Sequence, residues 1–163
     1  MLHRNRMPYL VSLFTAAAIP IAIASPPRLE TQLGIAHIGG LYSFSDTDYL
    51  NEGAAEARKI GARCIKVALS LDTDNPSPKL YPFHSTWPST ETLEDLADIP
   101  YFQSLFSRSF DIFILNAFRP GRFASYWREE FTSQDEQAEE ECFASLTRYL
   151  LSTYKNSHKT FTI

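Results

Sequence analysis

The chain has 163 residues, with 15 basic and 19 acidic side chains and a formal net charge of −4 at pH 7. This acidic balance disfavours a protein that follows the phosphates of a nucleic acid, because such proteins are basic. With two cysteines in the whole sequence, the chain is not a small scaffold held together by disulfides. Its length is enough for one domain with a hydrophobic core of its own.

The amino terminus has the pattern of a secretory signal peptide. Arg4 and Arg6 precede an apolar segment that runs from Met7 to Ala24 and ends in Ala-Ile-Ala, a small-residue cleavage pattern. We expect residues 1–24 to be removed and the protein to be secreted or extracytoplasmic. The alternative is a membrane anchor, which two prolines within the segment and its marginal length disfavour. Cleavage leaves 139 residues with 13 basic and 19 acidic side chains, so we expect no nucleic-acid partner and no membrane association.

The first predicted structural unit is a strand, a helix and a second strand. After a linker over residues 25–32, Leu33–Gly40 reads as a short strand that ends in paired glycines. A helix is predicted to begin at Asp46 or Thr47, either of which is a good N-cap, and to end at Gly61. The strand Arg63–Leu69 follows at once, which is the pattern of a right-handed βαβ crossover.

The next stretch changes in character. Residues 72–89 contain four prolines and several aromatic side chains, so we expect a long loop with neither a helix nor a central strand, and a functional role for it. Helical character returns at Thr92, with Asp95 as its capping-box partner, and again from Pro100 through Phe106.

The strongest strand signal is the nearly unbroken apolar run Phe110–Phe118, which is typical of a parallel strand buried on both faces. A loop over 119–132 leads to a long helix predicted to start at Ser133, with Glu136 completing a capping box, and to continue toward Tyr154. The alternating, β-branched residues 159–163 predict a fourth strand.

These elements predict an α/β fold over residues 33–163, with about four parallel strands and three helical regions. Long aromatic loops on the carboxyl side of the strands are typical of a (β/α)8 TIM barrel, of which the chain would form the amino-terminal half. The open sheet edges of such a half allow self-association of two copies. We expect Cys64 and Cys142 to be buried free thiols, although export would permit a bridge.

The opening Leu33–Gly40, the strand residues Ile65-Lys66 after Gly61-Ala62-Arg63, and the aromatic loops resemble secreted glycoside hydrolases of the TIM-barrel type. The resemblance is architectural and fixes no single family. It implies a polysaccharide substrate, no cofactor, and two catalytic carboxylates that follow the fourth and a later strand. Since neither position matches a residue before Ile163, the catalytic residues are unknown and we expect this chain alone to be inactive.

The carboxylates near strand ends are expected to have ordinary roles. Asp72 and Asp74 follow the second strand in a polar turn, where solvated loop acids are common. Glu129 and Glu130 precede the long helix, where they interact favourably with its dipole.

Seven residues are candidates for substrate binding: His37, Tyr42, Lys66, Trp87, Asn116, Arg119 and Trp127. His37 follows the first strand and would bind a hydroxyl or be a structural histidine, and Lys66 would take an inward polar role or form an ion pair. Asn116 and Arg119 end the third strand, where Arg119 would pair with a carboxylate or donate to sugar oxygens. The aromatic residues would stack on a pyranose ring or pack beneath the loops.

Other function classes lack their motifs. The sequence has no phosphate-binding glycine motif and no nucleophile elbow, and its histidines show no metal-ligand spacing, so we expect no metal site. The main alternative is a non-enzymatic exported module that binds carbohydrate or protein through its aromatic loops. A different TIM-barrel enzyme, such as a phosphodiesterase, would need a metal or paired histidines.

Overall fold

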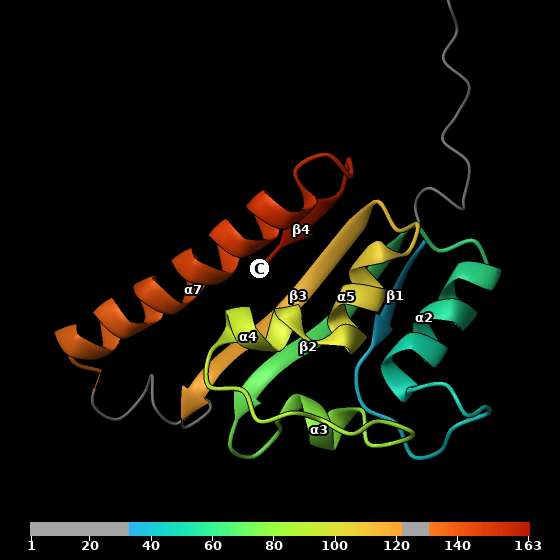
Figure 1. Cartoon of the computed structure of the whole chain (residues 1–163), viewed down its shortest axis with the longest axis horizontal. Helices are drawn as coiled ribbons and strands as arrows, with labels where there is room; N and C mark the ends of the chain where they lie inside the picture. The colour runs from blue at the N-terminus through green and yellow to red at the C-terminus, as the bar shows by residue number, and fades with distance from the viewer. Residues whose placement is uncertain (1–32, 122–130) are drawn as a thin grey trace, which may run out of the picture.

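The computed structural model describes residues 33–121 and 131–163, so the predicted signal peptide and linker, as well as Trp127, Glu129 and Glu130, lie outside the described residues. Four strands and five helices form the described part (Figure 1). In chain order they are β1 (Gly34–His37), α2 (Tyr49–Lys59), β2 (Cys64–Asp72), α3 (Ser77–Leu80), α4 (Leu93–Asp98), α5 (Pro100–Ser107), β3 (Ile112–Gly121), α7 (Ser133–Tyr154) and β4 (Thr160–Thr162).

The strands form one parallel sheet in the order β1-β2-β3-β4, which confirms the predicted α/β class and its four parallel strands. The order in the sheet is the order in the chain, so each strand pairs with its neighbours in sequence. Gly34, Cys64, Ile112 and Thr160 are register partners across the sheet. The two edge strands, β1 and β4, therefore lie level with one another.

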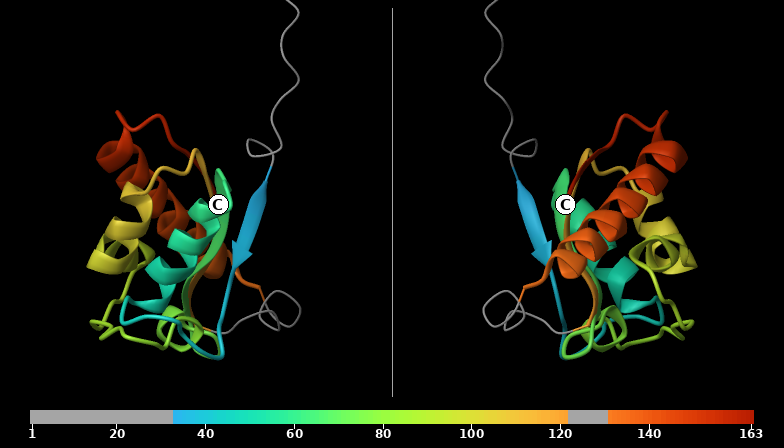
Figure 2. Two further views of the ribbon diagram at one scale, coloured as in Figure 1. Left: turned by 90° about the vertical axis from the view of Figure 1, so that its right-hand side faces the viewer. Right: turned by 90° about the vertical axis from the view of Figure 1, so that its left-hand side faces the viewer.

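The described helices gather on one side of the sheet, as the two side views show (Figure 2). On that side Phe113 and Leu115 of β3 are buried, whereas their neighbour Ile112 on the other side is 39% exposed. The prediction that this strand is buried on both faces is therefore wrong. The run is apolar in every position, but only the alternate residues that face the helices are covered.

We call the opposite side the bare face. It consists of the residues that alternate with the helix-facing ones, of which Ala68 and Ser70 are buried: Gly34, Ala36, Cys64, Lys66, Ala68, Ser70, Ile112, Ile114, Asn116, Phe118, Thr160 and Thr162.

Aromatic side chains hold the helices against the sheet. The ring of Phe106 on α5 meets Phe113 of β3 and Phe161 of β4 edge to face, with centroids 5.4 and 5.3 Å apart. Tyr154, at the end of α7, packs against Phe161 at 5.5 Å. Such pairs add to the hydrophobic gain of burying large rings. They tie the last helix and the last strand into the same core as α5.

The N-caps of both long helices lie one or two residues away from the expected ones. The N-cap of α2 is Asp48 rather than Asp46 or Thr47, and its carboxylate accepts the N–H of Asn51 at 3.0 Å. Gly61 adopts φ +88° after this helix, as predicted for a residue in the left-handed region.

The N-cap of α7 is Thr132, and its partner in a reciprocal capping box is Asp135. The predicted pair Ser133 and Glu136 lies one residue further on. Threonine and aspartate satisfy the same spacing, and the chain uses the earlier of the two sets.

The prediction of no helix in the proline-rich segment is wrong, because Ser77–Leu80 form the short helix α3. Beyond the end of β1, the edge of β2 has no strand beside it, and side chains from this segment satisfy its backbone. The hydroxyl of Tyr81 accepts the N–H of Ala68 at 2.8 Å and donates to the carbonyl of His37 at 2.9 Å. The hydroxyl of Ser77 accepts the N–H of Ser70 at 2.9 Å. The segment thus takes the place that a further part of β1 would fill.

Cys64 and Cys142 are both free, as predicted, although each is half-buried rather than fully buried. Burial raises the pKa of both thiols. In the described ranges, no helix is both long and apolar enough to cross a membrane.

Candidate functional site

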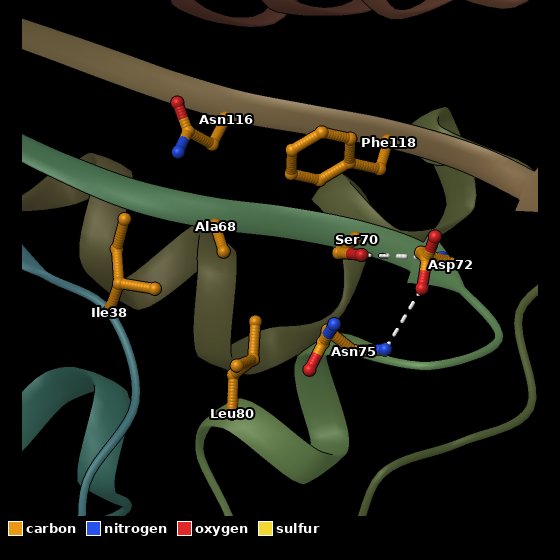
Figure 3. Close-up of a pocket in the computed structure, with 8 residues that line it drawn as sticks. All are labelled: Ile38, Ala68, Ser70, Asp72, Asn75, Leu80, Asn116 and Phe118. Atoms are coloured by element: carbon orange, nitrogen blue, oxygen red, sulfur yellow. Dashed lines mark hydrogen bonds between the residues drawn. The ribbon is translucent and has the colours of Figure 1, made fainter. Parts of the chain in front are cut away.

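A pocket of about 160 Å³ lies on the bare face near the carboxyl ends of β2 and β3 (Figure 3). Asn116 and Phe118 project from β3, and Ala68, Ser70 and Asp72 line it from β2. Ile38, Asn75 and Leu80 complete the wall from the loops after β1 and β2. The pocket stands where parallel α/β sheets place their ligand sites, outside the carboxyl ends of the strands.

Asp72 is the carboxylate of this pocket, and the structure contradicts its expected role as a solvated loop acid. The residue is only 2% exposed, whereas Asp74 is exposed as predicted. One oxygen, Oδ1, accepts the backbone N–H groups of Asp74 and Asn75 at 2.7 and 2.9 Å. These bonds fix the turn after β2 and hold the charged group at the rim of the pocket. The Asp-x-Asp-Asn spacing at the end of a strand is a turn signal that could have revealed this arrangement.

Asn116 is the candidate residue that the structure places in the pocket. It is half-buried, and its register partner Ala68 has no side chain large enough to cover it. Its amide provides both a donor and an acceptor to a ligand. Ser70 is the next residue after Ala68 on this face of β2. Its buried hydroxyl accepts the N–H of Asp72 at 3.2 Å.

Lys66 lies on the bare face, immediately before Ala68 among the residues of β2 on this face, and is half-buried. It was predicted to have either an inward polar role or a structural ion pair. Among residues 33–121 and 131–163, no carboxylate lies within 4.0 Å of its ammonium group. Its register partners are Ala36 and Ile114, so the positive charge stands in an apolar row.

Arg119 turns away from the pocket. Its guanidinium lies 2.7 Å from Glu139 and 3.8 Å from Asp135, both on α7. Of the two predicted roles, the structure shows the pairing with carboxylates. Arg119 therefore joins the end of β3 to the first turns of α7.

His37 is buried on the helix side of β1. Its Nε2 lies 3.1 Å from the carbonyl of Tyr49, and its ring packs between the rings of Tyr49 and Tyr81 at 5.0 and 5.4 Å. Burial lowers the pKa of His37, and its hydrogen bonds to α2 only partly oppose this effect. Of the two predicted roles, this is the geometry of the structural histidine.

The aromatic candidates occupy two different environments. Trp87 is half-buried under the proline-rich loop, where its indole N–H donates to Ser85 at 2.8 Å and its ring packs on Tyr101 at 5.1 Å. Tyr42 is 63% exposed and meets Phe44 edge to face at 5.2 Å. The loop after β1 thus presents aromatic side chains to solvent, whereas the loop after β2 buries its tryptophan. Trp127 lies outside the described residues.

One polar cluster could not be predicted from the sequence, because Ser43 and His84, which meet in it, are 41 residues apart. Ser43 Oγ lies 3.0 Å from Nε2 of His84, which has φ +54°, and the buried carboxylate of Glu52 accepts the N–H of Phe44 at 2.9 Å. The hydroxyl of Ser45 and this N–H lower the pKa of Glu52, against the opposing effect of burial. The cluster therefore joins the loop after β1 to α2 and to the segment that contains His84.

No group of three histidine, cysteine or acidic side chains in the described part of the chain is arranged to hold a metal ion. The pocket is lined instead by two amides, one buried hydroxyl, one buried carboxylate, a phenyl ring and aliphatic side chains, and its mostly apolar surface suits a ligand with an apolar face and a few polar groups. No protein-family model matches the sequence, and neither a curated protein nor a solved structure matches the chain. The function is therefore argued from the geometry of this pocket.

Proposed function

We propose that the chain is part of an exported, glycoside-hydrolase-like (β/α)8 barrel that binds carbohydrate in the pocket on the bare face. The observation that carries this proposal is the position of the pocket. It lies at the carboxyl ends of β2 and β3, on the side of the sheet that α2, α4, α5 and α7 leave uncovered. In a (β/α)8 barrel, that side is the interior and those strand ends form the active-site mouth.

The strand order supports the barrel interpretation over a doubly wound sheet. A doubly wound sheet reverses its strand order at a switch point and carries helices on both faces. Here the order β1-β2-β3-β4 has no reversal, and the described helices lie on one side. A singly wound sheet of this kind buries its second face only by curling toward further strands.

The lining chemistry supports carbohydrate as the ligand. Sugar rings present hydroxyl groups at their edges and C–H groups on their faces. Asn116 supplies a donor and an acceptor for hydroxyl groups, and Phe118 and the aliphatic lining supply an apolar surface. At about 160 Å³ the pocket is smaller than a drug-sized site, so we propose that it receives one sugar ring of a longer chain.

We further propose that this chain binds sugar without cleaving it. Hydrolysis by either stereochemical route needs two carboxyl groups across the scissile bond. The described residues that line the pocket include one carboxylate, that of Asp72, and its Oδ1 is already held by two backbone N–H groups. This feature also favours the second candidate function, a binding module with no catalytic role.

A sugar titration tests the proposal. Tryptophan fluorescence or NMR shifts would be followed while neutral mono- and oligosaccharides are added to the chain and to its Asn116→Ala variant. We expect the variant to bind at least about tenfold more weakly, because a buried ligand hydroxyl then loses its partner. Gln103→Ala is the matched control, since it removes an exposed amide of α5 that donates to Asp98. Failure of every sugar to bind at millimolar concentration would overturn the proposal.

A further inference from the structure

The sheet has two free edges that match each other. In the described part of the chain, β1 pairs only with β2, and β4 pairs only with β3. All four strands are parallel, and the register places β1 and β4 on the same rungs of the sheet. The outer edge of β4 can therefore receive a strand with the direction of β1, staggered along β4 as closure of a ring requires. Unpaired edges of this kind are ready-made templates for pairing with another chain.

The bare face adds an apolar surface between these edges. Ile112 on β3 is 39% exposed and Ile38 at the end of β1 is 40% exposed, while Ile114 and Phe118 are half-buried. Ile112 and Ile114 alternate with the buried residues Phe113 and Leu115 of the helix side. A parallel sheet with one face covered by helices gains free energy when the apolar side chains of its second face are also buried.

We propose that the occupant of this face is a second copy of the chain. Two copies related by a two-fold axis would join β4 of each to β1 of its partner, forming two identical parallel seams. The result is a closed ring of eight strands, in which no edge remains free and the bare faces turn inward. The pocket at Asp72 and Asn116 of each copy would then open into a shared interior. This proposal does not depend on the identity of the ligand.

Lys66 determines how strongly the copies associate. It stands on the bare face between Ala36 and Ile114, with no carboxylate of the described residues near its ammonium group. Closing the ring brings two such lysines into one interior, where unpaired like charges are costly. The wild-type pair is therefore weak, and removing these charges strengthens it.

Sedimentation equilibrium on the full chain tests this inference. We expect Lys66→Met to lower the dimer dissociation constant at least tenfold, because methionine keeps the aliphatic length and removes the charge. Lys59→Met is the control, since Lys59 lies on the outer surface of α2 with 69% of its side chain exposed, and it should leave association unchanged. A mixture of Lys66→Glu with wild type should form more dimer than either protein alone, which keeps the test valid if one variant is unstable.

The alkylation rate of Cys64 measures whether the copies meet at the bare face, because Cys64 lies on that face beside Gly34. In a Cys142→Ser background it is the single thiol of the chain, and we expect its alkylation to slow at least tenfold as dimers form. Three outcomes would overturn the proposal. They are a monomer for both wild type and Lys66→Met at millimolar concentration, an open series of larger oligomers, and dimers whose Cys64 reacts as fast as in the monomer. The last would mean association through another surface, such as the apolar amino-terminal residues.

Discussion

Tyr81→Phe removes one oxygen atom from the most enclosed polar contact near the pocket. The Tyr81 side chain is fully buried, and its hydroxyl bridges the N–H of Ala68 on β2 and the carbonyl of His37 on β1. Burial, the main cause, raises the pKa of this hydroxyl, so it remains a neutral donor at all ordinary pH values. The substitution leaves two buried backbone groups without a partner.

The expected cost follows from those two groups. An unsatisfied buried backbone group costs about 1–3 kcal/mol, so we expect Tyr81→Phe to lower the free energy of unfolding by about 2–4 kcal/mol. For a domain of this size, that change lowers Tm by roughly 5–15 °C. It is a large part of the roughly 5–15 kcal/mol by which such domains are stable.

Urea unfolding followed by circular dichroism measures this cost, and the chain supplies its own control. The hydroxyl of Tyr101 also bridges two backbone groups, accepting the N–H of Thr86 at 2.7 Å and donating to its carbonyl at 3.3 Å. Thr86 is exposed, so water replaces the lost hydroxyl in Tyr101→Phe, and we expect a loss below about 1 kcal/mol. Equal losses for the two variants would refute the reasoning from burial.

Two further predictions concern His37. Gly53→Ala should destabilise the chain by about 1–3 kcal/mol in urea unfolding, despite the better helix propensity of alanine, because its Cβ would lie 2.3 Å from Cε1 of the His37 ring. An increase in stability would show that the ring moves freely. Since burial lowers the pKa of His37, the unfolded chain binds this proton more readily than the folded one, so stability should fall as pH drops below 6.5. Unfolding between pH 5 and 7.5 should show a shallower dependence for His37→Gln, and an unchanged slope would contradict this assignment.

The order and direction of the strands could be predicted from local patterns. The sequence signals for these elements each lie within a few residues. They are the helix end at Gly61, the immediate return to an apolar strand, and the isolated apolar run before Asn116. The boundaries were less exact, because Asp48 competes with Asp46 and Thr47 as an N-cap, and Thr132 competes with Ser133. Each is an adequate cap, and tertiary packing selects among them.

The burial of individual residues could not be predicted in the same way. Asp72 belongs to a polar turn in the sequence, and it is buried because α3 folds back over the end of β2. His37 and Asn116 both follow apolar strand residues, yet one faces α2 and the other faces the pocket. A shift of one position along a strand turns a side chain to the opposite face of the sheet. An error of one residue in the predicted strand position therefore exchanges a core position for a ligand-binding position.

The agreement between strand order and chain order affects how this sheet can be made. Gly34 meets Cys64 thirty residues later, and Cys64 and Ile112 each meet a partner 48 residues further on. During synthesis the chain emerges with its amino terminus first. Each new strand can therefore pair with the edge of the strand that was completed just before it. No strand has to be inserted between two that are already joined. Synthesis itself can supply the sequence of assembly, one strand at a time.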